Sequence, residues 1–476
     1  CAPKSEKYPC ASATSISETI GKYRWTICAL VFFATTVNYF DRNVLGLLKP
    51  VLSEEGIFGA DKANQELYYS WVVMSFQIAY AIGMTIAGRF IDWIGTKKGY
   101  AYSLLGWSFA AIGHGLAYNT FTFGIWRAAL GLTEAGNFPA ANKTIAEWFP
   151  KKERAYATGI YNSGTNIGAI VTPLFVPWIA MHWGWKWAFI FVGIIGLSWL
   201  FFWYRIYASP DQKLKAGKLS QKEYDYIHSD IDEKADVDKA TEKVSWAKLL
   251  TYRQTWSFFL GKFLTDPVWW FYLFWLPAFL SGENARKIEQ FKALNPNFSG
   301  DNSDIPGIIT WTLAVAVVYT ISTIGSVYGG WLPKKFINGG MATYKARKLS
   351  MFIYALFPLT VLFASWLGKY NTWYAVLVIG LACAAHQAWS ANIFTTVSDM
   401  FPKKAVASVT GIGGMAGAVG GILVAQSAGL LLKHYTALGR IEAGYSMLFV
   451  YCGLAYVGAW VVMHFLIPRM KRVENL

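Results

Sequence analysis

The sequence FPKKERAYATGIYNSGTNIGAI at 149–170 returns, altered but in register, as FPKKAVASVTGIGGMAGAVGGI at 401–422. The two stretches align without gaps at an offset of 252 residues and are identical at ten of 22 positions. The shared order of FPKK and a later TGI is too specific to be expected by chance. The chain is therefore predicted to consist of two halves that share one fold.

The composition indicates a membrane protein. Hydrophobic residues occupy 54% of the 476 positions and charged residues 15%, whereas a soluble domain carries about 25% charged residues. A net charge of +15 alone would suit a nucleic-acid-binding protein, but long apolar runs separate the charges, so no nucleic acid partner is expected. Five scattered cysteines show no metal-ligand spacing. They predict neither a disulfide framework nor a metal or other cofactor.

Runs long enough to cross a bilayer, which takes about 20 mainly apolar residues, occur twelve times. They lie at 25–47, 69–90, 99–118, 121–146, 156–181, 185–206, 256–281, 308–332, 348–368, 372–399, 405–432 and 444–467. With the repeat, they predict an all-α polytopic membrane protein with twelve transmembrane helices in two pseudo-symmetric six-helix bundles. A parallel repeat places a substrate site between the bundles and favours a rocking carrier over a channel.

The predicted divisions follow from these runs. They are a tail at 1–24, a first bundle at 25–206, a linker at 207–255, a second bundle at 256–468 and a tail at 469–476. The linker holds nine basic and nine acidic residues, and a helix is predicted around Leu219–Ile227.

The loops between the runs differ in charge. Basic patches such as Lys97 with Lys98 fall on the same side as the linker, whereas the longest opposite loop, at 283–304, mixes three basic with four acidic residues. By the positive-inside rule, the basic loops, the linker and both termini are cytoplasmic. This predicts a multi-pass protein of the cell inner membrane.

The turn between the second and third runs reads GRFIDWIGTKK at 88–98. It resembles the major facilitator signature G-x3-D-[RK]-x-G-x-[RK]-[RK], with Trp93 in place of the usual basic residue. An ordinary polar turn is the alternative. Asp92, at the end of a helix, can pair with a neighbouring helix and hold an inner gate closed, so it is the candidate gating residue.

Two further stretches narrow the resemblance. NYFDR at 38–42 and RAALGLTEAGNFPAANK at 127–143 resemble the anion:cation symporter family of that superfamily. From about Trp25 to Pro468 the chain is similar to the bacterial hexuronate transporters of that family. The resemblance implies import of a small organic anion, a sugar acid such as glucuronate, galacturonate or galactonate, by proton symport and alternating access. It implies no enzymatic activity, and the protein is expected to work as a monomer in the lipid bilayer.

Ionisable residues inside spans are energetically costly and are therefore functional candidates. Asp41 and Arg42 are neighbours, so they point about 100° apart around a helix and can serve separate tasks. Arg127 and Glu134 are seven residues apart, on one face of the fourth span but too far apart to pair directly. Burial favours the uncharged form of a carboxyl group, which makes Asp41 and Glu134 the proton-coupling candidates.

Purely structural roles are the alternatives, a helix cap for Asp41 and Arg42 and an interhelical ion pair for Glu134. The resemblance adds that Asp41 carries a proton and that Arg42 binds the carboxylate of the substrate. A guanidinium suits this task because it matches a carboxylate bidentately and stays charged.

The repeat offset points to one residue in the second half. Position 134 plus 252 is His386, so the two residues are predicted to lie at equivalent depths on opposite walls. A histidine can titrate or donate a hydrogen bond, although a packed core histidine is the alternative. Gln387 follows it, and Lys262 and Asp266 are spaced to form an intrahelical pair.

Aromatic and amide side chains at membrane depth suit a polyhydroxylated acid, because rings can stack on its apolar face and amides both donate and accept. Packing is the alternative for the aromatic residues. The predicted substrate-binding residues are Tyr39, Arg42, Tyr80, Arg127, Asn162, Thr165, Asn166, Trp270, His386 and Gln387.

A symporter of another organic anion, such as galactonate, glucarate or another carboxylate, is the alternative within the same family. Two other functions are disfavoured. An organic phosphate antiporter would need arginines facing the site from both halves, but Arg42 and Arg127 both lie in the first. A membrane enzyme is disfavoured because the sequence shows no nucleophile–base constellation, HExxH motif or phosphate-binding loop. The sequence leaves open which sugar acid is carried and whether the coupling ion is a proton or sodium.

Overall fold

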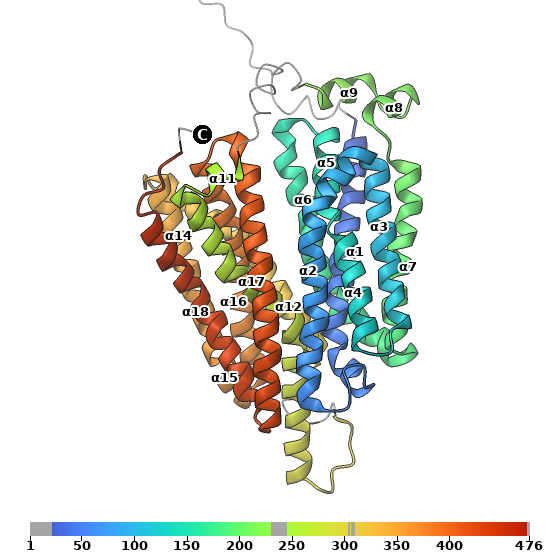
Figure 1. Cartoon of the computed structure of the whole chain (residues 1–476), viewed down its shortest axis with the longest axis vertical. Coiled ribbons are helices and arrows are strands. Elements are labelled where there is room, and N and C mark those ends of the chain that lie inside the picture. The colour runs from blue at the N-terminus through green and yellow to red at the C-terminus, as the bar shows by residue number, and fades with distance from the viewer. Residues whose placement is uncertain (1–20, 230–244, 303–304, 306–309, 474–476) are drawn as a thin grey trace, which may run out of the picture.

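The computed structural model describes residues 21–229, 245–302, 305 and 310–473. Within these ranges the regular structure is helical and no strand occurs. Figure 1 shows two upright helical bundles side by side, with the linker helices and the C-terminus at one end. We call this the linker end and the opposite one the far end.

The helices follow the chain in order. The first bundle consists of α1 (Tyr23–Glu54), α2 (Lys62–Ile94), α3 (Thr96–Gly113), the 3₁₀ turn η1 (His114–Leu116), α4 (Thr120–Glu134), α5 (Asn137–Trp148), α6 (Lys151–Trp183) and α7 (Trp185–Ile206). The linker contains α8 (Pro210–Lys215), α9 (Gln221–Ile227) and α11 (Trp246–Leu249). The second bundle consists of α12 (Arg253–Leu294), α13 (Trp311–Asn338), α14 (Thr343–Leu356), the 3₁₀ segment η4 (Phe357–Phe363), α15 (Ala364–Tyr370), α16 (Thr372–Met400), α17 (Lys403–Ala437) and α18 (Ile441–Leu466).

Eight helical segments in the described ranges are long and apolar enough to cross a membrane. They are α2, α7, α13, α16 and α18, most of α6 and α17, and the run from α14 to α15. The other four predicted spans correspond to α1, α3, α4 with α5, and α12. α1 and α12 bury charged side chains, and α3 begins with Lys97 and Lys98, so these helices are less apolar. The fourth span is divided into α4 and α5, of 15 and 12 residues.

The offset of 252 residues recurs in the helices themselves. α4 begins at Thr120 and α16 at Thr372, while α6 begins at Lys151 and α17 at Lys403. Asn119 and Asn371, the residues before α4 and α16, each accept a hydrogen bond from a nearby backbone N–H and cap the helix. The repeat therefore preserves helix starts as well as sequence.

One predicted loop was wrong, and two predicted spans contain a break that was not predicted. The loop expected at 283–304 is helical up to Leu294, because α12 continues past the bundle as a polar helix in which Glu283 pairs with Arg286. The span expected at 121–146 breaks at Ala135 and Gly136, where a side chain on Gly136 would collide with Ser103. The span expected at 348–368 contains η4, which begins where Pro358 cannot supply a backbone donor. The predicted linker helix, by contrast, is confirmed as α9.

The bundles touch each other toward the far end. The Tyr69 hydroxyl on α2 donates to the Phe274 carbonyl on α12 at 2.6 Å, and a Cβ on Gly46 would lie 2.6 Å from the Leu273 carbonyl oxygen. α2 and α17 also meet there, since a Cβ on Gly429 would lie 2.1 Å from the Ser70 hydroxyl. Close helix approach of this kind requires small residues.

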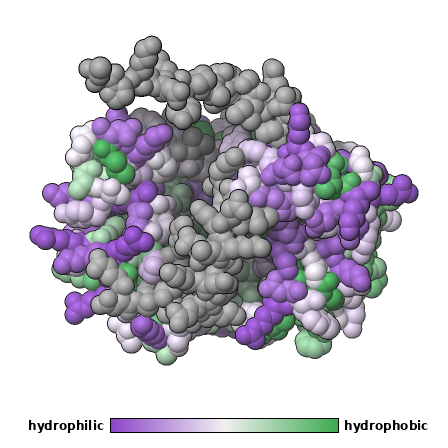
Figure 2. Space-filling view, turned by 90° about the horizontal axis from the view of Figure 1, so that it is seen from above, coloured by the Kyte–Doolittle hydropathy of each residue, from purple (hydrophilic) through white to green (hydrophobic). Residues whose placement is uncertain are grey.

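The bundles separate toward the linker end. A Cβ built on Gly88 of α2 or on Gly414 of α17 would meet no atom of the described chain within 4 Å. Figure 2 looks at this end and shows hydrophilic residues gathered on two lobes that lie on either side of the centre. The molecule is therefore closed at the far end and open at the linker end.

The first part of the linker is docked on the first bundle. Arg24 at the start of α1 donates to Glu153 of α6 at 3.0 Å and to Glu223 of α9 at 3.3 Å. The Tyr226 hydroxyl donates to the other Glu153 oxygen at 2.8 Å. Glu223 is only 2% exposed, so α9 is held by a buried ionic network rather than by a loose surface contact.

Candidate substrate and proton site

The centre of the first bundle holds an ion pair between two helices. The Nε and Nη2 atoms of Arg42 on α1 donate to the same oxygen of Glu134 on α4, at 3.2 and 2.9 Å. Arg42 is 3% exposed and Glu134 is fully buried. Glu134 is the last residue of α4, directly before the break that separates α4 from α5.

Aromatic rings surround the Arg42 guanidinium. Its central carbon lies 4.9 Å from the ring centres of Tyr39 and Tyr80, 5.4 Å from Phe76 and 5.5 Å from Trp270. Distances under about 6 Å allow cation–π attraction, which is strongest away from water. Trp270 belongs to α12, so the second bundle supplies one wall of the cage.

Two more charges lie in the same region. Arg127 on α4 is fully buried, and none of its guanidinium nitrogens has a hydrogen-bond partner within the described chain. It lies 4.7 Å from the Phe76 ring centre. Asp41 is 2% exposed and interacts electrostatically with Glu134 and Arg127. We call Asp41, Arg42, Arg127 and Glu134 the central cluster.

The second bundle contributes a buried histidine. Nδ1 of His386 lies 2.6 Å from the Tyr456 hydroxyl, and its ring stacks on Trp269 with centres 5.1 Å apart. His386 is 5% exposed, and Gln387 beside it is half-buried. The histidine is thus held by α12 and α18 on at least two sides.

The predicted pair on α12 is confirmed. The Lys262 ammonium lies 2.7 Å from Asp266 Oδ2. The Lys262 side chain is 7% exposed and the Asp266 side chain 21%. Both lie on the part of α12 between the linker end and Trp270.

The predicted polar residues of α6 lie apart from the ion pair. The exposed Asn162 and the half-buried Thr165 and Asn166 are in the part of α6 nearer the linker end, and the Thr165 hydroxyl donates to the Asn162 carbonyl within the helix. No contact of these side chains with the central cluster occurs within the described residues.

Asp92, the predicted gating residue, pairs with a neighbouring helix of its own bundle. Its carboxylate accepts from Lys143 of α5 at 2.7 Å. The Asp92 side chain is 73% exposed, so the pair lies at the surface of the linker end and joins α2 to α5 within one bundle.

Sequence reasoning missed two residues of the site. Phe76 lies against both Arg42 and Arg127, and Gln77 is 3% exposed with neither amide atom bonded to any described residue. Phe76 is one apolar residue among many in its span. Gln77 is the one glutamine in the predicted span at 69–90, and its amide group was the only signal that the sequence offered for it.

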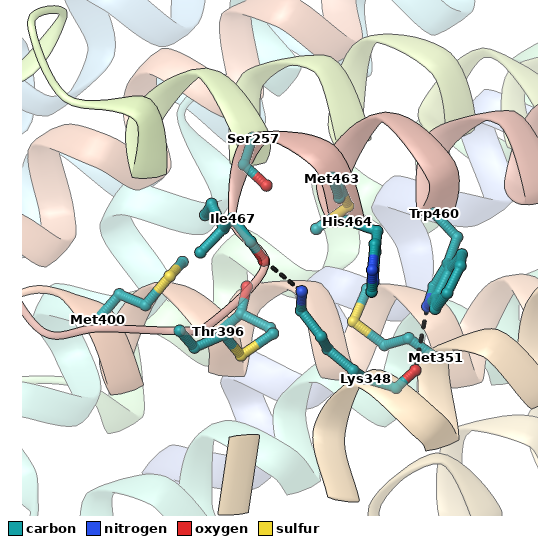
Figure 3. A pocket seen from close by; sticks show the side chains of 10 residues that line it. Ser257, Lys348, Met351, Thr396, Met400, Trp460, Met463, His464 and Ile467 are labelled. Atoms are coloured by element: carbon teal, nitrogen blue, oxygen red, sulfur yellow. Dashed lines mark hydrogen bonds between the residues drawn. The ribbon is translucent and has the colours of Figure 1, made fainter. Parts of the chain in front are cut away.

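A separate pocket lies inside the second bundle near the linker end (Figure 3). Lys348 points into it and donates to the carbonyls of Ile467, just past α18, and of Pro468, the latter at 2.9 Å. Methionines 351, 400, 463 and 470 line much of the rest. With about 20 Å³ of space it holds roughly one water molecule, so it is no substrate site.

Comparison with known proteins places this geometry in a family. The model of the Major Facilitator Superfamily matches residues 31–425. The chain belongs to the Major Facilitator Superfamily. This facilitator is 31% identical to the hexuronate transporter of Escherichia coli K12, over 86% of its own length and 87% of that protein. It is 31% identical to the galacturonate transporter of Dickeya chrysanthemi, over 66% and 82% of the two chains.

Solved structures agree with the fold. A D-xylose-proton symporter superposes on this facilitator with a TM-score of 0.69 at 15% sequence identity, covering 95% of this chain and all of that one. The protein is therefore a multi-pass membrane transporter with the major facilitator fold, and not an enzyme.

Proposed function

We propose that the protein imports a hexuronate, such as glucuronate or galacturonate, together with protons by alternating access. The observation that carries this proposal is the buried Arg42–Glu134 pair inside an aromatic cage to which both bundles contribute. The names of its relatives, a hexuronate and a galacturonate transporter, support the substrate class. A different sugar acid, such as galactonate, is the alternative within the same mechanism.

The pair offers a direct route to coupling. Protonation removes the Glu134 charge, so Arg42 loses its partner and becomes available to the substrate carboxylate. Breaking a buried ion pair on one side costs about 3–5 kcal/mol unless another charge replaces the lost one. The proton and the anion therefore each make the binding of the other more favourable. Asp41 is the second proposed proton site, and the unpartnered Arg127 offsets its charge.

The remaining predicted residues are assigned to the body of the substrate. Tyr39, Tyr80 and Trp270 present rings next to Arg42, where a sugar ring can pack. His386 and Gln387 approach from the second bundle and are proposed to set selectivity among sugar acids. Asn162, Thr165 and Asn166 are proposed to contact the substrate on its way from the open side.

The orientation follows from charge and from the linker. We propose that the linker end faces the cytoplasm, with both termini there, and that the far end faces outward across the inner membrane. Asp92 then tunes the cytoplasmic gate. The division into bundles at 25–206 and 256–468, joined by 207–255, is proposed to let each bundle move as a unit in a monomer.

Uptake into proteoliposomes tests the function. Labelled glucuronate, galacturonate and galactonate would be offered with an inward proton gradient, with an inward sodium gradient and with neither. We expect accumulation of a hexuronate only with the proton gradient. Accumulation with sodium alone would contradict proton coupling, and accumulation of none of the acids would contradict the substrate class.

A further inference from the structure

One face of α12 carries three side chains at intervals of four residues: Lys262, Asp266 and Trp270. Residues with this spacing lie above one another on a helix, about 6 Å apart along its axis. Trp270 packs against Arg42, so Asp266 and Lys262 continue the same face from the cage toward the open end.

The surroundings show where this pair points. Asp266 lies near Tyr39 of the opposite bundle, and Lys262 lies near His386. The Asp266 carboxylate fits against Gly417 of α17, where a Cβ would lie 2.3 Å from Oδ2. With its side chain still 21% exposed, Asp266 is not fully enclosed by the described residues.

We propose that Lys262 and Asp266 form a subsite that binds the end of the sugar acid opposite the carboxylate held by Arg42. This rests on the proposed function, since it presumes a sugar acid at Arg42. The subsite is a neutral pair that can donate to and accept from hydroxyl groups. A second carboxylate at that end would find both charges of the pair already matched and would gain no counter-charge for its burial, so the pair selects acids with one carboxylate over acids with two.

Two open-chain acids test whether the subsite prefers a hydroxyl group or a carboxylate. Galactonate and galactarate differ only at one end, where galactonate has a hydroxymethyl group and galactarate a second carboxylate. Each would compete, unlabelled, against the uptake of labelled galacturonate by proteoliposomes. The ratio of their inhibition constants measures the preference at the end of the ligand remote from Arg42. Effects on the carboxylate at Arg42 cancel in this ratio.

The charge that each substitution leaves behind predicts the direction in which the ratio of inhibition constants changes. Asp266→Asn leaves the Lys262 charge unopposed and should shift the ratio toward galactarate at least about tenfold. Lys262→Gln leaves the Asp266 charge and should shift it toward galactonate. The double variant is neutral again and should return toward the wild-type ratio, which separates charge from disturbed packing. Glu283→Gln, which removes the acid of another ion pair on α12, should leave the ratio unchanged.

An Asp266→Asn ratio equal to that of the wild type would overturn the proposal, as would single variants that shift in the same direction. If Asp266→Asn does not fold, Lys262→Gln decides alone by its direction. If the wild type takes up glucuronate but not galacturonate, labelled glucuronate replaces galacturonate in the competition. Wild-type protein that takes up neither would contradict the proposed function instead, so the two failures are distinct.

Discussion

Two nitrogens of Arg42 donate to one oxygen of Glu134, and four aromatic rings approach the guanidinium within 5.5 Å. Arg42→Lys keeps the charge but loses the planar, forked donor set. We expect substrate binding at least about tenfold weaker, which is about 1.4 kcal/mol. Calorimetric titration with the transported hexuronate measures it, with Arg89→Lys at an exposed position of α2 as the control. An unchanged dissociation constant would remove Arg42 from the substrate site.

The two buried carboxylates should separate coupling from binding. Asp41→Asn and Glu134→Gln each remove a proton site at a position with almost no solvent exposure. We expect both to lose accumulation driven by a proton gradient, and at least one to retain exchange of internal for external substrate. Asp225→Asn on the exposed face of α9 is the control. Full concentrative uptake by the Asp41→Asn, Glu134→Gln double variant would rule out this assignment.

Much of the chemistry at this scale could be predicted because charges inside apolar spans stand out in a sequence. The partners of these charged residues could not be predicted from the sequence. Arg42 and Glu134 are 92 residues apart, and seven-residue spacing indicated only that Glu134 needed a partner other than Arg127. Phe76 and Gln77 gave little signal, because a side chain that closes a cage around a cation looks like ordinary span residues until the helices are packed.

At the scale of elements, α9 is the segment that ties the linker to the first bundle. Glu223→Ala removes the buried acid that Arg24 contacts at 3.3 Å and leaves the 8% exposed arginine without that partner. Loss of one member of a buried pair is strongly destabilising. We expect a lower unfolding midpoint and faster protease cleavage near α9, with little change from Asp225→Ala on the exposed side of the same helix. Equal cleavage of both variants would contradict the role of the Arg24–Glu223 contact in holding α9 on the first bundle.

Hydrophobic runs located the spans, and the repeat matched α4 with α16 and α6 with α17. Breaks within spans were harder to predict. The turn at Gly136 lies against Ser103, which is remote in sequence. The extension of α12 to Leu294 is polar, so a span predicted from length and hydropathy ends before the helix does. Its helical form depends on contacts such as Lys287 with Thr372, at 2.8 Å, that only the folded bundle provides.

At the scale of the whole molecule, α17 carries a glycine toward each of its ends. The glycine toward the far end contacts the first bundle, whereas the glycine toward the linker end contacts no neighbouring helix. Gly429 has Ser70 against it, whereas Gly414 faces open space. Val in place of Gly429 should wedge the far end apart, and Val in place of Gly414 should prevent closure of the linker end. The two substitutions should therefore favour opposite states, while Gly458→Val on α18, which also faces open space, should favour neither.

Spin labels at positions 93 and 411, both exposed at the linker end, report which state is populated. We expect shorter label-to-label distances in Gly429→Val than in the wild type. Gly414→Val should keep the long distance when substrate shortens it in the wild type. Shifts in the same direction for both glycines would show that the bundles do not rock about the central cluster.

The charges around the central cluster have a consequence for membrane voltage. Asp41, Glu134 and Asp266 oppose Arg42, Arg127 and Lys262, three against three, so the empty carrier reorients without moving net charge across the field. One monoanion with two protons carries one positive charge inward, a step favoured by about 2.3 kcal/mol per 100 mV. We expect substrate-induced inward current that grows with negative internal potential, measured on supported membranes. A current that vanishes while uptake persists would mean that a single proton travels with each acid.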